Sequence, residues 1–253
     1  MAVSLAADLA RALDPAALAR QLGIEPDPWQ ARLLRSTSPR VLVNCSRQSG
    51  KSSTTALVAL HQAVYRAPSL VLMISRALRQ SQELFKKCAE CYRELGDQAP
   101  AAVAESSLRI ELENGSRIVS LPGGKEGDSI RGYSSVDLLA IDEAAFVPDA
   151  LYGSVRPMLA VSGGRLIALS TPHGSRGWWY DAWHSTEAWE RYRVPASECP
   201  RISAEFLEEE RRSMGAWWFS QEYMCEFLDS EAGAFTVEDV DAALSDEYEA
   251  WAL

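Results

Sequence analysis

The chain has 253 residues, 47% of them hydrophobic, which is enough for a large core and predicts one sizeable α/β domain with appendages. No apolar run approaches the roughly 18 residues of a membrane span, the start lacks the regions of a signal peptide, and five scattered cysteines suit a reducing compartment, so we expect neither a membrane nor a secreted protein. The net charge of −10 is uneven, because residues 205–253 hold 2 basic and 14 acidic residues while residues 1–204 are nearly neutral, so any contact with nucleic acid must be local or shared among subunits.

The first 35 residues predict a helical N-terminal segment. Residues 5–13 and 16–22 have the pattern of two short helices, and Asp14-Pro15 and Asp27-Pro28 are helix starts of the N-cap-plus-proline kind. The second of these pairs opens a helix that runs through Leu34.

From residue 41 onward, predicted strands alternate with predicted helices. The expected strands are 41–45, 70–75, 137–141 and 165–170, and the expected helices are 51–65, 78–95, 150–159, 175–185 and 203–214. Residues 108–113 and 117–121 alternate in hydrophobicity around Asn114-Gly115 and predict a β-hairpin. The alternation predicts a mostly parallel sheet flanked by helices, with ligands bound at the carboxyl ends of the strands.

The turn after the first strand has the composition of a phosphate-binding loop. Arg47, Gln48, Ser49, Gly50, Lys51, Ser52 and Ser53 follow the apolar run Val41–Val43. In such a turn, backbone N–H groups face the anion, the lysine adds positive charge and the first serine hydroxyl can ligate Mg²⁺. Cys45 departs from the pattern, since it stands where the first glycine of G-x-x-x-x-G-K-[ST] belongs.

Two later strand ends supply the partners that this loop needs. The apolar strand before Asp142 and Glu143 predicts that Asp142 lies beside the loop, where it can hold the Mg²⁺ shell, while Glu143 polarises an attacking water. Ser170, Thr171 and Pro172 end the next strand and put hydroxyl groups near the γ-phosphate. With the intervening buried strand at 70–75, these make four features, and their order favours a nucleotide hydrolase.

These elements together resemble the ATPase half of a tailed-phage large terminase, the motor that drives DNA into preformed capsids. The elements are 47–52, Ile74–Arg76 with Arg79–Gln82, Ile130–Gly132, Ile141–Ala145 and Ser170–Pro172. The resemblance runs from Trp29 to Leu228 and implies a P-loop NTPase of the additional-strand, catalytic-glutamate type, with a β-hairpin insertion near 107–121. It also makes Cys45 less of a departure, because terminases resemble one another in relaxing the first glycine.

The resemblance implies roles for single residues. Residues 48–53 wrap the phosphates, and Arg47 contacts or senses the γ-phosphate. Ser52 and Asp142 hold Mg²⁺, the latter through water, and Glu143 activates the attacking water. Ser170, Thr171 and Pro172 match the motif that couples hydrolysis to movement. Gln30 matches a glutamine that reads adenine, whereas its alternative is a surface position on a helix.

Arg131 is the expected arginine finger. It lies within a glycine-rich stretch, 123–132, and the resemblance implies that its guanidinium reaches a neighbouring subunit's γ-phosphate, where such a group contributes on the order of 10³–10⁵ in rate. The alternative is a solvated arginine, or one paired with Asp128 or Asp149.

Two further patterns favour structural roles. The stretch 176–193 mixes tryptophans and tyrosines with basic residues, which can stack on bases, but Trp179 and Trp183 share a helix face and we expect them in the core, as we do Trp29. Cys88 and Cys91 have the spacing of zinc ligands, yet no second pair accompanies them and we favour free thiols.

We therefore expect an ATP- and Mg²⁺-dependent motor that works as a ring, a pentamer when assembled and a monomer in isolation. The resemblance implies double-stranded DNA, portal protein and small terminase subunit as partners, in the host cytoplasm at the procapsid portal vertex. Residues 1–228 are the expected ATPase domain, with 41–228 as its core, and 229–253 an acidic linker toward an absent nuclease domain, so we expect no nuclease activity. The alternatives are a nucleotide-gated docking module without turnover and a fragment of a helicase-type ATPase.

Overall fold

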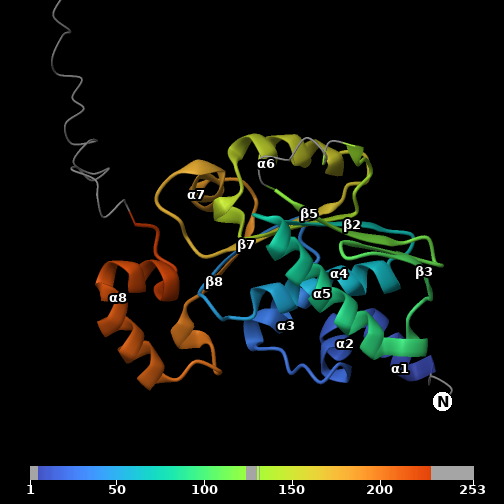
Figure 1. The fold of residues 1–253 in the computed structure, drawn as a ribbon, viewed down its shortest axis with the longest axis horizontal. Coiled ribbons are helices and arrows are strands. Elements are labelled where there is room, and N and C mark those ends of the chain that lie inside the picture. The colour runs from blue at the N-terminus through green and yellow to red at the C-terminus, as the bar shows by residue number, and fades with distance from the viewer. Residues whose placement is uncertain (1–4, 124–129, 131, 229–253) are drawn as a thin grey trace, which may run out of the picture.

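One eight-stranded sheet organises the chain. In the computed structural model, residues 5–123, 130 and 132–228 are described, and the strands lie in the order β3-β4-β5-β2-β6-β7-β1-β8 (Figure 1). The pairings of β3 with β4 and of β4 with β5 are antiparallel, and all others are parallel. The strand bounds are β1 Arg40–Cys45, β2 Leu70–Ser75, β3 Ala102–Glu105, β4 Arg109–Leu112, β5 Arg117–Pro122, β6 Leu138–Asp142, β7 Arg165–Ser170 and β8 Glu190–Val194.

Helices cover both faces of this sheet. Helices α1 to α5 lie on one face, and α6 and α7 lie on the other (Figure 1). The helix bounds are α1 Leu5–Leu13, α2 Pro15–Gln21, α3 Pro28–Arg35, α4 Lys51–Tyr65, α5 Leu78–Leu95, α6 Asp149–Val155, α7 Gly177–His184 and α8 Ala204–Met224. No helix in the described ranges is both long enough and apolar enough to cross a membrane.

Alternation along the buried strands supplies a hydrophobic layer to each face. On β1, Val41 and Val43 join the cluster under α2 to α5, whereas Leu42 joins the cluster under α6 and α7. The same division holds on β2, where Met73 belongs to the first cluster and Ile74 to the second. Because strands buried on both faces need apolar residues throughout, their sequences are continuous hydrophobic runs.

Helix α8 lies beyond the edge strand β8 and is bent. Gly215 has φ 81° and ψ 161° inside it, a conformation that only glycine adopts freely, so the helix changes direction there. Phe219 and Tyr223 on the second half pack with Ala196 in a small separate cluster. Ser203 caps the N-terminus of the helix, and its hydroxyl accepts a hydrogen bond from Phe206 N.

Each predicted strand and helix is present, including the hairpin around Asn114-Gly115, which joins β4 and β5. Two helices differ in extent: the one expected at 150–159 is α6 followed by a 3₁₀ turn at Arg156–Leu159, and the one expected at 203–214 continues past the Gly215 bend to Met224. Strand β5 also pairs in parallel with β2, so the hairpin belongs to the main sheet. Two edge strands, β3 and β8, were not predicted. All four residues of β3 are exposed and β8 carries three charged residues, so neither has the hydrophobic signal of a buried strand.

Candidate nucleotide site

The loop between β1 and α4 has the backbone of a phosphate cradle. Gln48 and Gly50 have positive φ values, 59° and 92°, and Lys51 is the first residue of α4. The positive φ favours glycine at position 50, and a Cβ there would lie 2.6 Å from Gln30 Nε2, so the Gln30 amide would have to move to accommodate a side chain. The Lys51 ammonium is buried and donates a 3.0 Å hydrogen bond to the carbonyl of Ser46 at the start of the loop.

Asp142 meets this loop, as predicted. It ends β6, and its Oδ2 accepts a 2.9 Å hydrogen bond from Ser52 Oγ on the first turn of α4. Burial raises the pKa of Asp142, although Lys51 and the Ser52 hydroxyl act in the opposite direction. A hydroxyl and a carboxylate at one point are the oxygen ligands that Mg²⁺ takes beside phosphate and water, so this pair fits the ion.

Glu143 turns away from the strand into the same site. Its φ and ψ of 53° and 46° lie in the left-handed region, so the chain reverses sharply immediately after Asp142. Burial raises the pKa of Glu143, Asp142 and Glu222 add to the rise, and Lys51 and Arg47 oppose it. A carboxylate with a raised pKa beside a phosphate cradle suits a general base.

The groups around Lys51 keep its ammonium charged. Burial alone would lower its pKa, but Cys45, Glu143 and Asp142 outweigh it and the pKa of Lys51 is raised. The site therefore keeps a buried positive charge between two carboxylates.

The loop forms one wall of a cleft of about 600 Å³. Its lining residues are Arg47, Gln48, Gly50, Lys51, Ser52, Arg76, Gln80, Lys87, Glu143, Phe146 and Thr171. Four of them are cationic and one is acidic, which suits a polyphosphate. Arg76 lies with its guanidinium 5.1 Å from the centre of the Phe146 ring, and the Phe146 ring in turn packs at a tilt of 31° against the His173 ring, with 4.3 Å between ring centres.

The predicted coupling residues touch both neighbours. Strand β7 lies between β1 and β6, so Ser170 and Thr171 emerge between the phosphate loop and Asp142. The Ser170 hydroxyl accepts a 3.1 Å hydrogen bond from the backbone N–H of Ala145, two residues after Glu143, and Thr171 lines the cleft. Pro172 follows and is buried.

Gln30 is buried against the loop with its amide engaged. Its Nε2 donates a 3.0 Å hydrogen bond to Thr54 Oγ1, and its Oε1 accepts one of 2.8 Å from Asp27 N. It therefore is not a surface residue, and it lies outside the residues that line the cleft. Ser53 follows Ser52 on α4 and is partly buried, and Ser49 donates to Ser46 O at 2.8 Å. Arg131 lies outside the described residues.

Two residues at the site were not predicted from the sequence. Arg201 donates to Ser49 O at 3.0 Å and pairs with Asp27 at 2.7 Å, so it fixes the loop from the side of α8. Glu222 pairs with Arg47. No local signal identifies either, because their partners in the loop lie more than 150 residues away in the chain.

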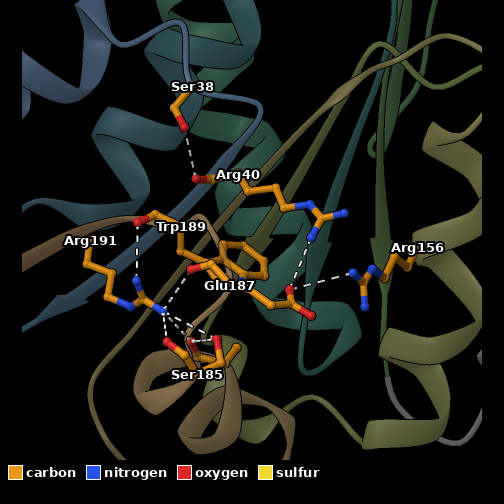
Figure 2. Close-up of polar contacts among 8 residues, drawn as sticks. Ser38, Arg40, Arg156, Ser185, Glu187, Trp189 and Arg191 are labelled. Carbon is orange, nitrogen blue, oxygen red and sulfur yellow. Dashed lines mark hydrogen bonds and ion pairs between the residues drawn. The ribbon is translucent and has the colours of Figure 1, made fainter.

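Of the two tryptophans expected in the core from the stretch 176–193, Trp179 is buried and Trp183 is partly buried against the same cluster. Trp178 and Trp179 belong to the core under α6 and α7, and Trp29 to the opposite core. Arg191 donates to the carbonyls of Ala182, Trp183 and Ser185, which closes the C-terminus of α7. Glu187 lies between Arg40 and Arg156, at 3.1 and 3.7 Å (Figure 2). The charges of Arg40, Arg156 and Glu187 are therefore paired with one another, and they lie near the amino end of β1, away from the cleft.

Cys88 and Cys91 are free cysteines on α5, the first buried and the second partly so. Burial raises the pKa of both thiols. Among the described residues, no three His, Cys, Asp or Glu side chains form a group that could hold a metal ion.

Comparison with known proteins identifies the family. The model of the family described as "Terminase large subunit, T4likevirus-type, N-terminal" matches residues 42–241, well over half of the chain. The chain belongs to this family. It is 28% identical over 177 residues to the terminase large subunit of Thermus virus P23-45, a match that covers 63% of this chain and 36% of that protein.

Solved structures agree on the fold. The large terminase ATPase domain of Thermus phage P74-26 is similar with a TM-score of 0.71 and 23% identity, over 83% of this chain and 97% of that one. The large terminase of a thermophilic bacteriophage, in complex with ADP, is similar with a TM-score of 0.64 and 12% identity, over 80% and 54%. The P-loop NTPase fold predicted from the sequence is thereby confirmed. The chain spans about a third of the length of the curated terminase it matches.

Proposed function

We propose that this chain hydrolyses ATP and that a ring of such chains uses the hydrolysis to translocate double-stranded DNA into procapsids. The observation that carries the proposal is the junction of Ser52 with Asp142, which brings a phosphate loop, an oxygen pair for Mg²⁺ and the following Glu143 to one cleft. The ADP complex of the thermophilic-phage terminase supports nucleotide binding at this fold. We assign this activity to residues 1–228.

The residues then divide the work. The backbone from Gln48 to Ser53 and the Lys51 ammonium bind the phosphates, and Ser52 and Asp142 hold Mg²⁺, which neutralises charge on the phosphates when bound. Glu143 takes a proton from the attacking water, and its raised pKa suits that task. Arg47 contacts the γ-phosphate at the mouth of the cleft. Ser170 and Thr171 lie next to both the loop and the Glu143 turn. They transmit the structural change caused by ATP hydrolysis to the rest of the domain.

Glu143 favours a hydrolase over a docking module without turnover. A site that only binds nucleotide needs the cradle and the Mg²⁺ ligands, but not a second carboxylate beside them. Purified chain should therefore release phosphate from ATP, slowly when isolated, and Glu143→Gln should lower kcat by about 10²–10⁴ while nucleotide binding persists. A wild-type chain that binds ATP but stays inert at high concentration with DNA would favour the docking module.

Assembly as a ring rests on Arg131. We propose that Arg131 acts on the nucleotide of a neighbouring subunit in a pentameric ring. The ring would assemble on the portal protein in the host cytoplasm and would also bind the small terminase subunit. Mixing Arg131→Ala chains with Glu143→Gln chains tests this, since each lacks a different part and a shared site would regain hydrolysis. If assembled mixtures regain none, the action in trans is wrong.

A further inference from the structure

Helix α8 returns to the phosphate loop at Glu222. The Arg47 Nε lies 2.5 Å from Glu222 Oε2, and the backbone N–H of Arg47 donates a 3.0 Å hydrogen bond to the carbonyl of the same residue. Both the side chain and the backbone of Arg47 are therefore fastened to one residue of α8.

The two partners differ in exposure. The side chain of Glu222 is 9% exposed, whereas that of Arg47 is 62% exposed and lines the cleft. In the described part of the chain, Arg47 is the one cation within 4.0 Å of the Glu222 carboxylate. A buried carboxylate with a single cationic partner holds that partner firmly, because separation would leave a buried negative charge unpaired.

The contact uses only part of the guanidinium. Glu222 accepts from Nε, and among the described residues neither terminal nitrogen of Arg47 has a hydrogen-bond partner. An arginine anchored through Nε keeps terminal N–H donors for an anion, and an anchored side chain loses less rotamer freedom when the anion binds.

We propose that Glu222 is the positioning residue for Arg47: it holds the guanidinium by Nε so that the terminal nitrogens meet the γ-phosphate. This inference rests on the proposed function, since it takes ATP as the ligand of the cleft. The second half of α8 would then support the contact with the γ-phosphate, because Glu222 on that helix holds the Arg47 side chain.

The test is the affinity of the chain for ATPγS and for ADP, each with Mg²⁺, measured by titration calorimetry. Glu222→Gln keeps the volume and removes the anchoring charge, so we expect ATPγS to bind about two- to fivefold more weakly, the loss typical of one partly exposed ion pair. ADP has no γ-phosphate, and its affinity should stay unchanged. In an Arg47→Gln background, Glu222→Gln should have no further effect.

Glu226→Gln is the matched control. Glu226 follows α8 and pairs with Arg193 at 3.8 Å with both side chains about half exposed, and it does not line the cleft. The control removes the same charge from the same region and should alter neither affinity. Thermal melting checks that the variants fold. If Glu222→Gln does not fold, Glu222→Asp retains the charge, and it should weaken the binding of ATPγS, but not of ADP, to a smaller extent.

Several results would overturn the inference. Equal weakening of ATPγS and ADP, or a loss that persists with Arg47→Gln, would mean that Glu222 only supports the fold. Tighter ATPγS binding would mean that Glu222 competes with the phosphate for Arg47, and no change would mean that the pair is incidental. Absence of ATPγS binding by the wild-type chain would instead refute the proposed function.

Discussion

Ser52 and Asp142 are 90 residues apart in the chain, yet the Ser52 hydroxyl donates a 2.9 Å hydrogen bond to the Asp142 carboxylate. The contact joins the first turn of α4 to the carboxyl end of β6, with β7 lying between β6 and the strand that leads into the loop. It fixes the distance between the phosphate cradle and the acidic turn.

Removing one of these oxygens should impair use of Mg²⁺. We expect Asp142→Asn to raise the Mg²⁺ concentration for half-maximal hydrolysis by at least about tenfold, because a carboxylate near the ion is replaced by a neutral amide. Titration of Mg²⁺ at saturating ATP measures the effect. Asp137→Asn, just before the other end of the same strand with its carboxylate bonded to Leu70 N, should leave the titration unchanged; equal curves for the two variants would refute the assignment.

The raised pKa of Glu143 predicts a pH dependence of stability. Because the folded pKa lies above the unfolded value of about 4.3, Glu143 stabilises the fold below that value and costs stability as the pH rises through the folded pKa. Glu143→Gln should therefore melt at a higher temperature than wild type at pH 8, and the difference should vanish toward pH 4. The same change at the exposed Glu209 serves as the control. A difference in melting temperature between Glu143→Gln and wild type that grows as the pH falls would contradict the prediction.

A side chain at Gly50 should cost stability and weaken nucleotide binding. Alanine there adds left-handed strain of about 1 kcal/mol and a contact of 2.6 Å that the Gln30 amide must move to relieve, so Gly50→Ala should lower the melting temperature and weaken nucleotide binding. Gly163 has φ +63° and open space around its Cβ position, so Gly163→Ala carries the strain without the contact. Similar losses in both variants would show that strain alone decides.

Arg201 should matter to both fold and site. Arg201→Gln leaves the buried Asp27 carboxylate without its cation and frees the Ser49 carbonyl, for a loss of about 1–3 kcal/mol in the free energy of unfolding and weaker nucleotide binding. Urea denaturation and ADP titration measure the two effects. Arg212→Gln changes an exposed arginine bonded to Glu208 O on its own helix and should be silent; unaltered ADP affinity in Arg201→Gln would confine Arg201 to stability.

The sequence predicted those parts of the site that local pattern determines. The phosphate loop and the Asp142-Glu143 turn each follow a continuous apolar strand, and parallel topology brings such strand ends together. Burial of Trp179 followed from helical spacing.

What remained hidden depends on tertiary contacts. Arg201 and Glu222 reach the loop from the segment after β8, and a charged residue on an amphipathic helix gives no indication of a partner so far away in sequence. The edge strand β8, with Glu190, Arg191 and Arg193 in five residues, lacks the apolar run that marks a central strand.

The path of the chain beyond α8 has a mechanical consequence. The Cys225 carbonyl accepts a 2.9 Å hydrogen bond from Asn44 on β1, and Leu228 O lies 3.9 Å from the Cβ position of Gly174, just past Pro172. A tensile load applied at residue 228 would thus act on Asn44, in the strand that leads into the phosphate loop, and on Gly174, just after the coupling residues. The hydrogen bond between Asn44 and the Cys225 carbonyl would carry part of that load to the strand that leads into the phosphate loop.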